Sequence, residues 1–206
     1  LVTAGGRAIR FPTTDIRVFK SRGSTGVRGI RLAEGDKVVS MAIIRHFEAT
    51  PEEREAYLKQ RRLMAGAPDE AEADEADAEE ATVEAGQLST ERYAEMSAAE
   101  DLILTITAGG SGKLSSSHGY PVRGRGGMGV KAMDGAMRGG PLVASFPVDL
   151  TDQIMLATST GQSIRVPVDQ ISFRSRSAGG VKVFNTGGDE EVVSVARVAE
   201  QGDDQA

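Results

Sequence analysis

Short apolar runs alternate with glycine-rich turns along most of this chain. Residues 1–3 and 7–11 flank the pair Gly5-Gly6, and a longer apolar run follows at 38–44. Two short runs joined by a glycine pair predict a β-hairpin. Similar runs recur later, at 102–106, 112–114 and 141–146, and again at 154–157, 161–166 and 192–196. The pattern predicts an all-β fold built from units of four short antiparallel strands.

Each unit carries the same basic motif. It consists of a cation, one spacer residue, Arg, three further residues, Gly-Val and a final cation. We name the three copies cassette 1 (20–28), cassette 2 (123–131) and cassette 3 (174–182). Units that recur about every 50 residues are typical of propellers and solenoids. Gly26, Gly129 and Gly180 precede the valines, where we expect a positive φ or a close backbone approach. The cassette cations are Lys20, Arg22, Arg28, Arg123, Arg125, Lys131, Arg174, Arg176 and Lys182.

The repeats divide the chain into three predicted blades and two acidic additions. The blades are 1–46, 102–149 and 150–198, the insertion is 47–101, and the tail is 199–206. Thr50 followed by Pro51 and Glu53 predicts a capped helix to about residue 65. A second helix is expected over 89–96, and the Ala/Glu/Asp tract 66–86 between them is expected to be mobile.

The formal net charge of −6 conceals a strong segregation of charge. Residues 48–101 hold 17 Asp and Glu but only 5 Lys and Arg. Without that insertion and the tail, the repeats have a net charge of +9. Such asymmetry indicates a polyanion-binding body with acidic additions.

No motif for catalysis, metal or cofactor binding withstands inspection. Residues 124–129 match GxGxxG, but the strand and long helix that a dinucleotide site requires are missing. Residues 109–113 lack the first glycine and the hydroxyl residue of a phosphate loop. His46 and His118 stand alone, there is no Cys, and no nucleophile elbow accompanies any serine. We therefore expect no cofactor, no metal and no enzymatic activity of the chain by itself.

The residues that are scarce indicate which nucleic acid would bind. Aromatic residues make up 4% of the chain, too few for base-stacking platforms. No recognition helix with Arg, Asn or Gln on one face is predicted outside the insertion. Cations without either feature suit phosphate contacts to duplex DNA with little sequence preference. Beyond the cassettes, the candidate contacts that follow hairpin turns are Arg7, Arg10, Lys113 and Arg165.

Residues 3–11, with Gly26-Val-Arg-Gly-Ile30 and Gly35-Asp36, resemble the C-terminal domain of bacterial DNA gyrase A. The resemblance covers about 150 of the 206 residues. It implies a β-pinwheel, a propeller-like disc whose basic outer rim wraps duplex DNA so that strand passage adds negative supercoils. It also implies that the catalytic tyrosine, ATP and Mg²⁺ belong to other parts of an A2B2 complex with gyrase B, in the bacterial cytoplasm beside the nucleoid and not in a membrane.

Three features qualify this resemblance. The family's disc has six blades, so the chain is expected to be its last half and a piece of a longer protein. The family's signature box, Gln-Arg-Arg-Gly-Gly-Lys-Gly, is absent, and residues 60–62 match only its first three letters, inside the insertion. Two alternatives therefore remain open: the equivalent domain of topoisomerase IV, and a propeller whose basic edge binds an acidic protein.

Overall fold

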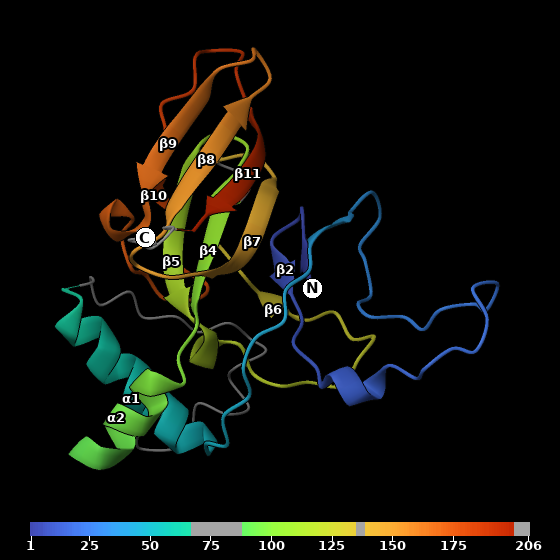
Figure 1. Cartoon of the computed structure of the whole chain (residues 1–206), viewed down its shortest axis with the longest axis vertical. Helices are drawn as coiled ribbons and strands as arrows, with labels where there is room; N and C mark the ends of the chain where they lie inside the picture. The colour runs from blue at the N-terminus through green and yellow to red at the C-terminus, as the bar shows by residue number, and fades with distance from the viewer. Residues whose placement is uncertain (67–87, 135–138, 200–206) are drawn as a thin grey trace, which may run out of the picture.

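The computed structural model describes residues 1–66, 88–134 and 139–199 and folds into three antiparallel sheets. We number the sheets by the repeat that supplies most of their strands. In Figure 1 the third sheet stands above the second, and the first sheet lies beside them. The first sheet has the strand order β3-β1-β2-β6, with β1 Val2–Thr3, β2 Arg7–Ala8, β3 Val38–Ser40 and β6 Val130–Lys131.

The second and third sheets come from the later repeats. The second has the order β10-β5-β4-β7, with β4 Leu102–Thr107, β5 Ser111–Ser116, β7 Leu142–Val148 and β10 Val181–Lys182. The third has the order β11-β8-β9, with β8 Gln153–Thr158, β9 Ser163–Pro167 and β11 Val192–Val198. Three 3-10 turns, η1 Thr13–Asp15, η2 Ser117–Gly119 and η3 Val168–Gln170, follow the second strands of the repeats.

The cassette strands pair outside their own repeat, which corrects the prediction of self-contained blades. Strand β6 of the second repeat pairs with β2 of the first, where Ala8 faces Val130. Strand β10 of the third repeat pairs with β5 of the second, where Gly112 faces Val181. The expected strand at 27–30 does not form within the described chain. Cassettes 2 and 3 thus each complete the sheet of the repeat before them.

The core lies on both faces of the second sheet. Leu104 and Ile106 of β4 pack with Ile154 and Leu156 of β8 in one cluster. Ile103, which points to the opposite face, packs with Val2 of the first sheet in another. Alternate residues of a strand face opposite sides of the sheet. Strand β4 is therefore buried on both faces, because the second sheet packs between the first and the third.

The insertion contains a helical hairpin fixed to the second repeat. Helix α1, Pro51–Met64, begins with the predicted capping box, in which Thr50 and Glu53 bond reciprocally. Helix α2, Thr90–Ala98, is capped by Ser89. These findings confirm both predicted helices. The tract 66–86, predicted to be mobile, lies outside the described residues apart from Gly66.

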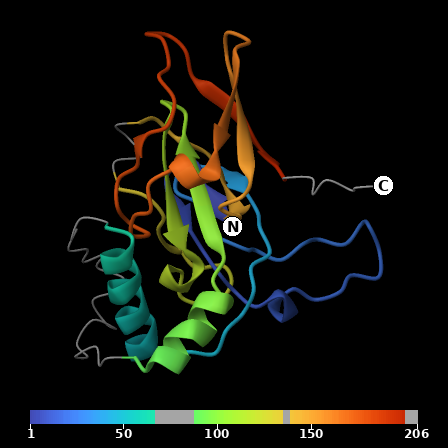
Figure 2. The ribbon, with the colours of Figure 1, turned by 60° about the vertical axis from the view of Figure 1, so that its left-hand side comes forward.

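Aromatic and histidine side chains connect this hairpin to η2. Tyr57 of α1 stacks on Tyr93 of α2, with ring centroids 4.9 Å apart. The rings of His118 in η2 and Tyr57 form a T-shaped pair with centroids 5.0 Å apart, and Nε2 of His118 lies 2.9 Å from the carbonyl oxygen of Met96. The hairpin is therefore held by a small core of its own. It lies on the opposite side of the molecule from the projecting loop 11–37 (Figures 1 and 2).

Candidate nucleic-acid interface

The three cassettes lie next to one another and are joined by hydrogen bonds. Arg125 Nη1 of cassette 2 donates to the carbonyl oxygen of Arg28 in cassette 1 at 3.0 Å. The backbone N–H of Gly126 donates to Gly29 O at 2.7 Å. Arg176 Nη1 of cassette 3 donates to the carbonyl oxygen of Lys131 in cassette 2. We name this continuous arrangement the cassette line.

The predicted contact residues fall into three groups by exposure. Six cations are exposed, five are half-buried and two are buried. The exposed ones are Lys20, Arg22, Arg28, Arg125, Arg165 and Lys182; the half-buried ones are Arg7, Arg10, Arg123, Lys131 and Arg174; the buried ones are Lys113 and Arg176.

The exposed cations are not paired with carboxylates. Within the described part of the chain, no ion pair involves any of the six. Lys131, which is half-buried, by contrast lies 3.7 Å from the exposed Asp134. Exposed cations that no carboxylate neutralises attract an anionic ligand most strongly.

Lys113 does not belong to the contact surface, which corrects its assignment from the sequence. Its side chain is fully buried, and Nζ donates to the carbonyl oxygens of Ser175, Arg176 and Ala178. Ile9 occupies the matching position one repeat earlier, since Ala8 and Gly112 both face a cassette valine. Lys113 therefore holds cassette 3 in place.

Arg176 needs the same correction. Its side chain is 8% exposed, and its guanidinium bonds to the carbonyl oxygen of Lys131. A cation surrounded by protein in this way cannot neutralise a phosphate. Arg176 connects neighbouring cassettes.

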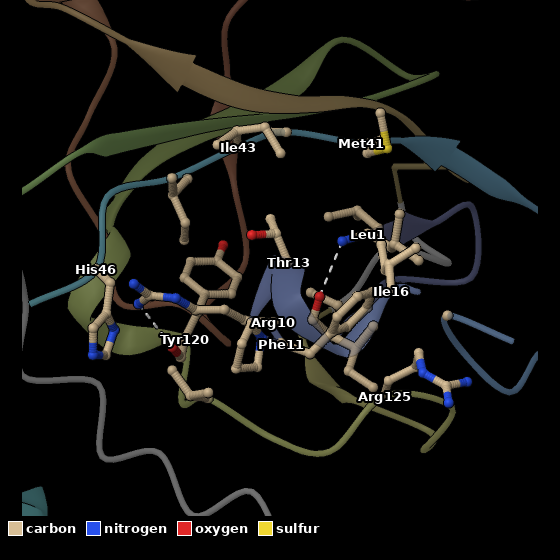
Figure 3. A pocket seen from close by; sticks show the side chains of 18 of the residues that line it. Leu1, Arg10, Phe11, Thr13, Ile16, Met41, Ile43, His46, Tyr120 and Arg125 are labelled. Atoms are coloured by element: carbon tan, nitrogen blue, oxygen red, sulfur yellow. Dashed lines mark hydrogen bonds between the residues drawn. The ribbon is translucent and has the colours of Figure 1, made fainter. Parts of the chain in front are cut away.

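Arg10 has an architectural role as well. Its guanidinium donates to the carbonyl oxygens of Ser117 at 3.1 Å, Tyr120 at 3.3 Å and Arg45 at 2.7 Å. Burial lowers its pKa from the ordinary value, and Arg54 nearby lowers it further. Figure 3 shows the side chain directed at Tyr120. Arg10 ties the first repeat to η2 and leaves little of its charge at the surface.

The cassette glycines differ in what they require. Gly129 has φ +70, and a Cβ there would collide with Ala8 O. A Cβ on Gly180 would lie 2.9 Å from Gly112 N, so this glycine permits a close approach to β5. Gly26 has neither a positive φ nor a neighbour within 4 Å. The predicted need for glycine, a positive φ or a close backbone approach, is therefore met in cassettes 2 and 3, which pair with a sheet, and not in cassette 1.

A cavity of about 700 Å³ opens between the loop 11–37 and the first sheet (Figure 3). Its lining is mainly apolar, with Phe11, Ile16, Met41 and Ile43 among the residues. No carboxylate from the described residues lines it. Among the described residues, no cluster of three metal-ligating side chains occurs, and no helix is long and apolar enough to cross a membrane.

Two exposed cations beside cassette 1 were not predicted. Arg17 lies over the Phe19 ring, 4.5 Å from its centroid, and Arg31 donates its N–H to Gly127 O. Both side chains are exposed, but neither belongs to the repeated basic motif, so the sequence pattern did not mark them.

The first two sheets each have four short antiparallel strands, one of them contributed by the next repeat, and this arrangement defines a propeller-like, β-pinwheel class of domain. A solved DNA gyrase A C-terminal domain shares this fold, with a TM-score of 0.61 and 19% identity over 96% of this chain and 49% of that one. The C-terminal domain of DNA topoisomerase IV gives a TM-score of 0.63 at 18% identity, covering 96% and 45%. The fold alone does not separate the two.

The family model for the DNA gyrase C-terminal domain, a β-propeller, matches residues 1–45, 101–140 and 152–199, so the chain belongs to that family. The DNA gyrase A protein of Granulibacter bethesdensis is 47% identical over 95% of this chain, and that of Rickettsia bellii is 41% identical over 99%. The chain spans 22% of the length of each of these relatives. The names of these relatives favour gyrase over topoisomerase IV.

Proposed function

We propose that the chain binds duplex DNA along the cassette line without sequence preference and bends it. The supporting observation is the continuity of the line, in which each cassette is bonded to the next through Arg125 and Arg176. Phosphates of a curved duplex would then contact Lys20, Arg22, Arg28, Arg123, Arg125, Lys131, Arg165, Arg174 and Lys182, with Arg7 at the edge.

The energetic requirement is moderate. Bending 20–30 base pairs by 40–90° costs about 1–6 kcal/mol, and neutralising several phosphates releases enough counterions to offset it. The cations without acidic partners are suited to this, because no protein ion pair must break first. Wrapped DNA of fixed handedness would be the contribution of this domain to a gyrase.

For the whole protein, we infer the gyrase A component of a type IIA topoisomerase that introduces negative supercoils with ATP. The catalytic tyrosine would lie in another part of that component, and ATP and Mg²⁺ would bind elsewhere in an A2B2 assembly with gyrase B. The protein would then act on the bacterial chromosome in the cytoplasm.

Fluorescence anisotropy of a labelled 30–40 base-pair duplex at several salt concentrations tests the proposal. The slope of log affinity against log salt changes by about 0.9 for each phosphate contact. Replacing Lys20, Arg22 and Arg28 with Gln should therefore flatten the salt slope by the equivalent of nearly three phosphate contacts. Neutralising the exposed acids Glu34, Asp189 and Glu191 in that variant restores its net charge and should not restore the slope.

A shallow salt slope for the unaltered chain would reject the proposal. It would favour the propeller that binds an acidic protein, because binding to a few carboxylates releases few ions. A steep slope with no bending, measured by energy transfer between labels at the duplex ends, would leave DNA binding without wrapping.

A further inference from the structure

The last two turns of helix α1 rest on cassette 3. Arg62 Nη1 bonds to Ser175 Oγ at 3.2 Å, between the two arginines of that cassette. The Arg61 guanidinium lies 4.6 Å from the centre of the Phe173 ring. The insertion is thus placed against the cassette line and not only against the blade.

Cassette 3 presents less charge than cassette 1. Arg176 is buried and Arg174 is half-buried, whereas Lys20 and Arg22, their counterparts in cassette 1, are both exposed. Lys113 draws the carbonyls of 175, 176 and 178 toward the interior, which turns this cassette inward. A duplex that follows the line would meet fewer cations here.

The end of α1 supplies the missing charge. No carboxylate occurs between residues 56 and 66, and the acids of α1 all lie in its first turns. Glu100 neutralises Arg61 at 3.1 Å. Lys59 is exposed and precedes Arg62 by three residues, so the two side chains are neighbours on one helix face.

Basic residues at a helix C-terminus are often present only to complement the helix dipole. That role requires no particular neighbour, and it does not explain why Arg62 bonds to the serine between the two arginines of cassette 3. We propose that Lys59 and Arg62 form a phosphate-binding extension of the cassette line, contacting duplex DNA where Arg174 and Arg176 are turned away. This inference rests on the proposed DNA-binding function.

The test is duplex binding by the 206-residue chain carrying Lys59→Gln and Arg62→Gln, measured across salt concentrations. Two lost contacts should flatten the salt slope by about two units and weaken affinity about fivefold to tenfold per contact near 0.1 M salt. Lys59→Gln alone leaves the bond of Arg62 to Ser175 in place and should flatten the salt slope by about half as much as the double variant. Arg62→Lys keeps the charge and should retain most of the affinity.

Two controls separate contact from other effects. Adding Glu55→Gln and Glu91→Gln to the double variant restores its net charge and should not restore binding. Near-ultraviolet circular dichroism of the Tyr57–Tyr93 pair reports whether the hairpin stays docked. Unchanged affinity in the double variant overturns the inference, and tighter binding overturns it in favour of a hairpin that shields cassette 3. If the unaltered chain binds duplex without salt dependence, the proposed function itself fails.

Discussion

Arg125 reaches back 97 residues to donate a hydrogen bond to the carbonyl oxygen of Arg28. Arg176 makes the same bond to the carbonyl of Lys131, which stands where Arg28 stands in the preceding cassette. One side chain of each later cassette therefore bonds to the backbone of its neighbour. The basic motif encodes both a charged surface and the joint that aligns it.

Removing this joint should cost more stability at Arg176 than at Arg125. Arg176 is itself buried, and Arg176→Gln leaves the part-buried carbonyl of Lys131 without its charged donor, a loss that typically costs about 1–3 kcal/mol. Arg125 is exposed, so water can replace its bond and the loss should stay below about 1 kcal/mol. Urea unfolding of the two variants measures the difference. Equal and small losses would show that the bond at Arg176 does not hold the cassettes together.

Lys113 should behave as a structural residue and not as a DNA contact. Lys113→Met removes a buried ammonium that three carbonyls share, and the free energy of unfolding should fall by at least about 1–3 kcal/mol. The salt slope of DNA binding should stay the same. Lys182→Met is the matched control, because Lys182 is exposed. It should flatten the slope by about one contact with little loss of stability.

The sequence predicted the cassettes and most of the strands, the one expected at 27–30 excepted, but not how the repeats join. Alternation and glycine pairs reveal β4 and β5 because these signals are local. The partner of Val130 is Ala8, more than 100 residues away, and no local signal specifies such a pair. Lys113 was misassigned for a related reason: it follows a hairpin turn as Arg7 does, but it falls on the face of β5 that the third repeat covers.

His118 should make the docking of the helical hairpin depend on pH. Burial lowers its pKa below the ordinary 6.5, Arg10 and Arg54 lower it further, and Met96 O and Glu100 oppose this. The unfolded chain therefore binds the proton more readily than the native one. The contribution of neutral His118 to the free energy of unfolding is therefore fully present above about pH 6.5. It is lost as the pH drops from there through the lower pKa of the native state.

Urea midpoints between pH 5.5 and 7.5 measure this dependence. His118→Gln should remove most of it, whereas His46→Gln should not, since His46 is exposed and its ring bonds to the exposed carboxylate of Glu48. If the His118 variant keeps the full pH dependence of the unaltered chain, the effect comes from another group.

The acidic tract 66–86 should compete with DNA for the cassette line. It contains nine carboxylates and no Lys or Arg, and the chain enters it directly after helix α1, which bonds to Ser175. Deleting it should tighten duplex binding at low salt. The gain should shrink as salt rises, because the screening length falls from about 30 Å at 0.01 M to about 10 Å at 0.1 M. A variant of the same length with Asn and Gln for the nine acids isolates charge from tether length and should match the deletion. Equal affinities for all three chains at low salt would mean that the tract does not reach the line.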